Sequence, residues 1–159
     1  MGSESDLPVM QSALEALQEF RVPCEVRVLS AHRSPEAVHE FATQAEARGL
    51  RVIIAGAGGA AHLAGVIASL TTLPVIGVPM PTERAGGLDS LLSTVQMPQG
   101  VPVATMGVGK SGAANAAVLA VQILALSDEA LKKALNAYKS RLARSVSEAD
   151  EQIRKTVKG

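Results

Sequence analysis

The order of segments along the sequence predicts a single α/β domain, residues 1–159, built on a parallel sheet with right-handed crossovers. Short apolar runs of strand length alternate with longer runs whose apolar residues recur at helical spacing. The run from Val52 to Ala55 is apolar at every position, which is typical of a parallel strand covered on both faces. Turns that contain glycine or proline separate many of these runs.

Five helices are predicted before the last segment, at residues 7–20, 34–48, 61–70, 88–95 and 113–126. The first has an apolar face through Met10 and Leu17. The second starts at Ser34-Pro35, a strong signal for a helix N-terminus. The fifth is almost wholly apolar, which predicts burial on every side, in the domain centre or at a subunit contact.

Four strands are predicted, at residues 24–29, 52–55, 74–79 and 101–106. The first alternates apolar and polar residues like a half-buried strand, and we interpret Cys24 at its start as a small buried hydrophobic side chain. Residues 2–6 resemble the loop that follows a strand, yet Met1 alone precedes them. A central strand usually feeds such a loop in a parallel sheet, so we expect the start of the sequence to be truncated or misassigned.

Residues 128–157 differ from the rest because they are rich in charged side chains. Their apolar residues recur at spacings of three and four: Leu131, Leu135, Tyr138, Leu142, Val146, Ala149, Ile153 and Val157. A single stripe of this length exceeds what a lone domain needs, so we expect a C-terminal helical extension that contacts a neighbouring subunit. The alternative is a helix folded back on its own domain.

Composition excludes several classes of function. Hydrophobic residues make up 47% and charged residues 19%, as in a soluble globular protein. The few aromatic residues cannot form stacking platforms for nucleic acid, and fifteen basic residues balance fifteen acidic ones, so no net positive field attracts nucleic acid or anionic lipid. The single cysteine fits a reducing compartment. We find neither a signal peptide nor an apolar run of membrane-spanning length, and we expect a cytoplasmic protein with no membrane contact.

Three glycine-containing runs could approach a phosphate. Residues 107–111 fail as a nucleoside-triphosphate loop, because Ala104 stands where the first glycine is required. Residues 56–61 fit the dinucleotide fingerprint, but residues 72–82 lack the acidic residue that should hold a ribose. Residues 2–6 offer hydroxyls and amides for a phosphate and a carboxylate for a ribose; ordinary helix capping explains them equally well.

Loops that leave the carboxyl ends of parallel strands share one edge of the sheet, where ligands bind. Four such loops carry the polar residues Ser3, Ser5, Asp6, Ser30, His32, Arg33, Gly56, Gly58, Gly59, His62 and Arg84. These groups predict a small phosphorylated ligand, with Arg33 on the phosphate. His32 is the natural proton carrier, since the unperturbed pKa of histidine lies nearest neutrality. His62 is equally compatible with a buried structural histidine, and His39 with an exposed one. No spacing typical of metal ligands occurs, so we expect no metal.

The stretches GSESD, SAHRSPE, AGAGGAAHLAG, LDSLLSTVQMPQGVPVAT and KSGAANAA occur in this order between residues 2 and 117. In this the chain resembles the bacterial 5-(carboxyamino)imidazole ribonucleotide mutases of purine biosynthesis (the class I phosphoribosylaminoimidazole carboxylase catalytic subunit family). The resemblance extends to about residue 126. It implies a flavodoxin-like three-layer fold, a homo-octamer, and transfer of a carboxylate from the exocyclic nitrogen to ring carbon 4 without metal, biotin or ATP.

The resemblance also implies a role for individual residues. It makes His32 the general acid/base, places Asp6 on the ribose with Ser3 as a further substrate contact, and places Ser5, Ser30 and Arg33 around the phosphate. It further implies that the segment with Gly58, Gly59, His62 and Leu63 forms the wall that holds the carboxylate and the released carbon dioxide.

Two other functions remain open on these residues. A direct carboxylase of the animal type would have lysine at the position of Arg33 and would lack the AGAGGAAH run, both of which favour the mutase. A dinucleotide-binding module, non-catalytic or redox, is the third hypothesis. Ala64 departs from the family, which commonly has a proline there, and we expect only a local change at the helix start.

Overall fold

Three parallel strands form the sheet in the computed structural model, which describes residues 1–157. β1 (Ile53–Ala57) pairs with β2 (Val75–Pro79), and β2 pairs with β3 (Ala104–Thr105). The register places Ile54 opposite Ile76. β2 is buried at every position, as expected for a strand whose two faces are both covered.

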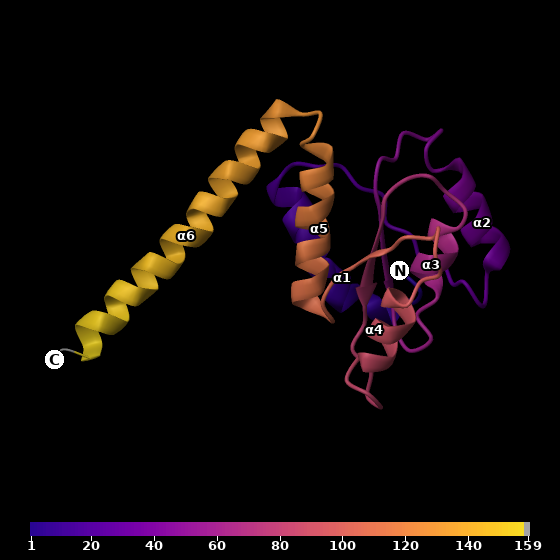
Figure 1. Ribbon diagram of the computed structural model, residues 1–159, viewed down its shortest axis with the longest axis horizontal. Helices are drawn as coiled ribbons and strands as arrows, with labels where there is room; N and C mark the ends of the chain where they lie inside the picture. The colour runs from indigo at the N-terminus through magenta and orange to yellow at the C-terminus, as the bar shows by residue number, and fades with distance from the viewer. Residues whose placement is uncertain (158–159) are drawn as a thin grey trace.

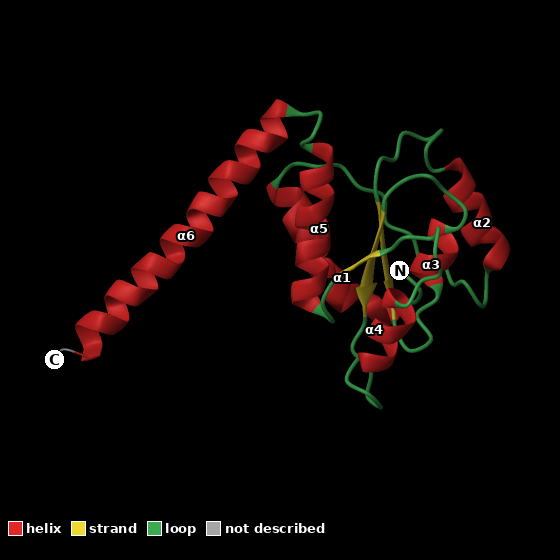
Figure 2. Ribbon diagram, viewed as in Figure 1, coloured by secondary structure: helices red, strands yellow, loops and turns green. Residues whose placement is uncertain are grey.

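Helices cover both faces of this sheet, so that the domain has three layers (Figures 1 and 2). α1 (Leu7–Glu19) and α5 (Lys110–Leu124) lie on one face, and α2 (Pro35–Gln44) and α3 (Leu63–Ala68) lie on the other. α4 (Leu88–Val95) packs against β2 and β3. The predicted αβα sandwich with a parallel sheet is therefore confirmed.

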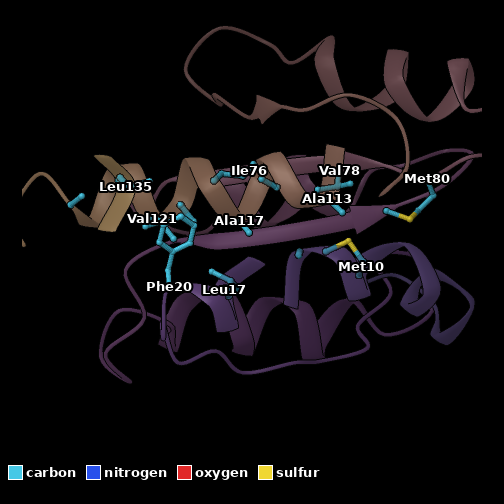
Figure 3. Close-up of a cluster of buried hydrophobic side chains, with 14 residues drawn as sticks. Met10, Leu17, Phe20, Ile76, Val78, Met80, Ala113, Ala117, Val121 and Leu135 are labelled. Carbon is cyan, nitrogen blue, oxygen red and sulfur yellow. The ribbon is translucent and has the colours of Figure 1, made fainter. Parts of the chain in front are cut away.

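The main core lies between α1, α5 and β2 (Figure 3). Small side chains on α5, namely Ala113, Ala116, Ala117 and Ala120, are buried and let this helix approach α1 closely. Larger side chains from α1 and β2 fill the remaining space, including Met10, Leu17 and Ile76. α5 is buried through its apolar residues as predicted, while its two amide side chains, Asn115 and Gln122, are exposed.

Most helices begin and end within three residues of the predicted positions. α2 is the exception at its C-terminus, because it ends at Gln44 and not at residue 48. Residues 45–49 form turns instead, and Gly49 adopts a left-handed conformation with φ of 89°. That conformation suits glycine and ends a helix.

α6 (Glu129–Val157) projects away from the sandwich (Figure 1). The Asp128 carboxylate caps its start by accepting hydrogen bonds from two backbone amides. Near its start Leu135 is buried, and the Tyr138 ring packs on Phe20 with 5.3 Å between ring centroids. Residues 141–157 are all exposed, including the apolar side chains predicted to form a stripe: Leu142, Val146, Ala149, Ile153 and Val157. Within residues 1–157, every helix is too short or too polar to cross a membrane.

The prediction of a half-buried strand at residues 24–29 is wrong. The segment is extended but unpaired as a strand, and Val26 and Val28 are about half exposed, at 47% and 54%. Along this segment the backbone pairs with Met1, whose amine donates to the Arg27 carbonyl at 2.8 Å. A ladder of one residue cannot organise six, so the alternating pattern has no neighbouring strand to pair with. For the same reason Cys24 is exposed, contrary to the buried position predicted for it.

An apolar groove of about 760 Å³ lies beside this segment. We define the apolar groove by the residues of α1, the segment 21–27, the segment 48–54 and the end of α5 that line it. Leu17 of α1 and Ile54 of β1 contribute to its walls, and Arg51 lies at its edge. The groove accounts for much of the apolar surface that residues 24–29 would otherwise have covered.

Candidate active site

A second hollow, which we call the polar pocket, lies at the carboxyl ends of β1 and β2. It encloses about 510 Å³. Its lining residues come from four segments of the chain: Gly2, Ser3, Ser5, Asp6, Ser30, Ala31, His32, Arg33, Ala57, Gly58, Ala60, His62, Leu63, Met80 and Pro81. Because parallel strands end at the same edge of the sheet, segments far apart in the sequence meet there.

The first segment, residues 2–6, is held by a capping box. The Ser3 amide donates to the Asp6 carboxylate at 3.0 Å, and the Ser5 amide donates to the Ser3 hydroxyl at 3.3 Å. The Ser5 hydroxyl also lies 2.9 Å from that of Ser3. The Gly2 amide donates to the Gly56 carbonyl at 2.9 Å, which ties the segment to β1. The hydroxyls are therefore positioned by the local fold and remain partly accessible to a ligand.

Asp6 carries the carboxyl group of the polar pocket. Partial burial raises the pKa of Asp6, and this effect exceeds the opposing effects of the backbone amides of Ser3 and Gly2, of the Met1 amine and of the Arg33 guanidinium. A carboxylate held in this way has lost part of its hydration. It can recover that hydration by accepting hydrogen bonds from a ligand hydroxyl.

The second segment is the turn before α2. The Ser30 hydroxyl lies 3.3 Å from Arg33 Nε, and Arg33 Nη2 donates to the Gly2 carbonyl at 3.1 Å. The Ser34 hydroxyl closes the turn through hydrogen bonds with the Ser30 backbone. These bonds aim the guanidinium at the rim of the polar pocket while its remaining N–H groups stay exposed, an arrangement suited to a phosphate or carboxylate.

His32 and His62 meet across the polar pocket. Nε2 of His32 lies 2.8 Å from Nδ1 of His62, and the two rings pack edge to face with 4.9 Å between centroids. His32 comes from the turn before α2, and His62 directly precedes α3. His62 is thus exposed and paired with a second histidine, which differs from the buried structural role that its apolar neighbours in the sequence made equally plausible.

The third segment, residues 58–63, is positioned from α4. The Gly59 amide donates to the hydroxyl of Ser90 at 2.9 Å, and the Ser93 hydroxyl donates to the Gly59 carbonyl at 3.2 Å. Gly59 has φ of 66°, a conformation that favours glycine. Sequence reasoning missed both serines, because hydroxyls on a short helix look like ordinary surface residues. Ser90, however, is fully buried.

Most of the predicted site residues line the polar pocket, and two do not. Gly59 stands behind the lining, where the α4 hydroxyls hold it. Arg84 lies in the exposed loop before α4 and does not line the polar pocket, although Met80 and Pro81 of the same loop do. His39 is exposed on α2, as predicted. Among residues 1–157 no three histidine, cysteine or acidic side chains cluster so as to hold a metal ion.

Proteins with a similar sequence share one printed name. A protein of Mycobacterium tuberculosis called N5-carboxyaminoimidazole ribonucleotide mutase is 56% identical over 155 residues, which cover 98% of this chain and 88% of that protein. A protein of Bacillus subtilis with the same name is 52% identical over 153 residues, which cover 96% of this chain and 94% of that protein.

The fold and the family model agree with these relatives. The crystal structure of Treponema denticola PurE superposes with a TM-score of 0.87 and 27% sequence identity, covering 96% of this chain and 94% of that one. Residues 1–145 match the family model described as AIR carboxylase. With a family match over most of its length and relatives at more than half identity, the chain belongs to the AIR carboxylase family.

Proposed function

We propose that this protein is an isomerase of purine biosynthesis that converts N5-carboxyaminoimidazole ribonucleotide into 4-carboxy-5-aminoimidazole ribonucleotide in the polar pocket. The observation that carries the proposal is the meeting of His32, Arg33 and Asp6 in one pocket, in a chain 56% identical to a protein named for this activity. These side chains offer one group for each part of such a substrate: proton transfer, phosphate binding and ribose binding.

The phosphate of the substrate would bind beside Arg33. The guanidinium supplies a fixed positive charge with N–H groups directed outward, and the hydroxyls of Ser5 and Ser30 add donors next to it. Asp6 would accept a hydrogen bond from a ribose hydroxyl, with Ser3 as a further contact. The raised pKa of Asp6 supports this role, because a partly dehydrated carboxylate gains from a new donor.

The carboxylate would be transferred in two steps with His32 as acid and base. First the bond between the carboxyl carbon and the exocyclic nitrogen breaks, and that nitrogen keeps the electron pair and takes a proton from the His32 imidazolium. Ring carbon 4 then attacks the released carbon dioxide, and the hydrogen on carbon 4 returns to His32 as a proton. No proton is gained or lost overall, and one positioned group is typically worth about 10²- to 10⁴-fold in rate.

Carbon dioxide has to stay beside the ring between these steps. The wall formed by Gly58, His62 and Leu63 would confine it, since Leu63 is buried and Gly58 brings the backbone close to Met80. Confinement turns a bimolecular encounter into an intramolecular one. In this scheme the chain itself needs neither a cofactor nor a metal ion.

The direct test is to mix the full-length protein with N5-carboxyaminoimidazole ribonucleotide, without ATP or bicarbonate, and to follow the carbon-carboxylated isomer by absorbance. We expect turnover. A parallel reaction with aminoimidazole ribonucleotide and bicarbonate separates the alternative, because a direct carboxylase would form the product there at the higher rate. A folded sample that isomerises nothing would contradict the proposed function.

We propose further that residues 1–159 act as one domain in a homo-octamer, with residues 128–157 as the subunit contact, and that the protein acts in the cytoplasm on a soluble ribonucleotide without binding nucleic acid or membrane. The exposed stripe on α6 supports this: Ile153 is 64% and Val157 is 79% exposed, more than a lone helix would leave to water. Light scattering should give the mass of an oligomer, and Val146→Asp with Ile153→Asp should lower that mass. A monomeric unmodified protein would contradict the proposal.

A further inference from the structure

The contact between the two histidines of the polar pocket constrains how protons are placed on them. At 2.8 Å, His32 Nε2 and His62 Nδ1 must share one proton: two protons would clash, and none would leave two lone pairs facing each other. If His62 accepts, neutral His32 carries its proton on Nε2, and its Nδ1 is the free base. The hydrogen bond therefore selects a tautomer.

The groups around the pair do not impose this choice by themselves. Asp6 and Arg33 are the charged side chains that share the polar pocket with the two rings, and they are of opposite sign. The hydrogen bonds of Arg33 go to Ser30 and Gly2, and Asp6 accepts from Ser3, so these groups are engaged on the side of residues 2–6. From β2, the apolar Met80 and Pro81 line the polar pocket.

We propose that His62 is a positioning residue, which accepts the Nε2 proton of His32 and so leaves Nδ1 of His32 as the nitrogen that exchanges a proton with the substrate. This inference rests on the proposed function, in which His32 must give and take back one proton. A histidine in the other tautomer would present a protonated Nδ1 after the first step and could not accept the proton from carbon 4. His62 would therefore keep the second step open.

Two variants of His62 separate this role from a merely structural one. His62→Leu removes the acceptor. His62→Asn keeps an oxygen near the position of Nδ1 and cannot relay a proton through a ring. Since His62 is exposed and its side chain donates to nothing in the core, both variants should fold, which thermal unfolding will check.

The tautomer of His32 can be observed without any substrate. The full-length protein, labelled with ¹⁵N-histidine, contains three histidines, and long-range ¹H–¹⁵N correlations report which ring nitrogen carries the proton. His39, exposed on α2, serves as the internal reference. We expect His32 to be protonated at Nε2 in the unmodified protein and in His62→Asn, and to populate both tautomers in His62→Leu.

Kinetics should follow the same order. We expect kcat for isomerisation to fall about 5- to 10-fold in His62→Leu with KM within about twofold, the factor that one hydrogen bond of ordinary net strength gives, and to recover in His62→Asn. An unchanged His32 tautomer in His62→Leu, or equal kcat losses in both variants, would overturn the proposal. If the tautomer is selected but the unmodified protein isomerises nothing, the proposed function fails, and the hydrogen bond remains as a feature of the pocket.

Discussion

Met1 and Gly2 are consecutive in the chain, yet they line different hollows. Met1 lines the apolar groove, and Gly2 lines the polar pocket. Both hollows border β1, and the backbone of these two residues separates them: Met1 pairs with Arg27 and Leu29, and Gly2 pairs with Gly56.

The two hollows differ in how their walls are held. In the polar pocket each functional side chain has a hydrogen-bonded partner within the fold, such as Ser30 for Arg33 and His62 for His32. The apolar groove is lined mostly by aliphatic side chains of α1, β1 and α5, which contribute by burial and packing. Changes in the polar pocket should therefore alter activity at constant stability, and changes in the groove should do the reverse.

The largest effect is expected from His32→Asn. The variant removes the group proposed to transfer the proton, and isomerisation should fall about 10²- to 10⁴-fold, while the midpoint of thermal unfolding stays within the error of measurement. His39→Asn is the matched control, since His39 is exposed on α2 outside both hollows, and it should keep full activity. Full activity in His32→Asn would remove the acid/base role.

The next effect concerns the apolar groove. Leu17→Ala removes a buried side chain that lines it, and the free energy of unfolding should fall by about 2 to 3 kcal/mol, the low end for such changes because the site opens to the groove. Denaturant unfolding measures this change. Leu142→Ala on exposed α6 is the control, with an expected change below about 0.5 kcal/mol. A loss of kcat in folded Leu17→Ala would blur the division between the hollows.

An arginine from each hollow gives the third comparison. Arg33→Ala should weaken substrate binding about 10- to 100-fold, because a charge-assisted hydrogen bond to the phosphate is lost. Arg51→Ala, from the edge of the apolar groove, should leave binding unchanged. Calorimetry on the two variants measures this difference, which should shrink at high salt. Equal losses of affinity would place the phosphate elsewhere.

The same contrast explains what could be predicted from the sequence. The apolar pattern of residues 113–126 and the stripe on residues 128–157 predicted α5 and α6 correctly, because helical periodicity is a local property. The alternation at residues 24–29 misled, since a strand forms only where another strand pairs with it, and this depends on the rest of the chain.

The polar pocket was predictable through the rule that loops at one edge of a parallel sheet meet. That rule brought His32, Arg33 and Asp6 together, but it cannot say which side chains touch. The pairing of His32 with His62 depends on the relative height of two loops, and the support of Gly59 by Ser90 depends on how α4 packs. Both are tertiary properties that no local pattern encodes.

The smallest effect on stability is expected at Asp6. Burial raises the pKa of its carboxyl, so the native protein binds this proton more tightly than the unfolded chain. The protonated form thus stabilises the fold below the unfolded pKa, and this contribution is lost as the pH rises through the raised folded pKa. Asp6→Asn keeps an acceptor for the Ser3 amide without the charge. It should raise the free energy of unfolding at pH 7, by no more than about 1 kcal/mol because Asp6 is partly exposed.

Denaturant unfolding at pH 7 and pH 3.5 checks this sign. The gain should vanish at pH 3.5, where the native carboxyl is largely protonated, and Glu151→Gln on exposed α6 should change little at either pH. A loss of stability at pH 7 would contradict the expectation. A gain at pH 7 that comes with weaker substrate binding would show that the polar pocket keeps a destabilising carboxylate for its ligand, whereas the apolar groove contains no group whose removal should stabilise the fold while costing activity.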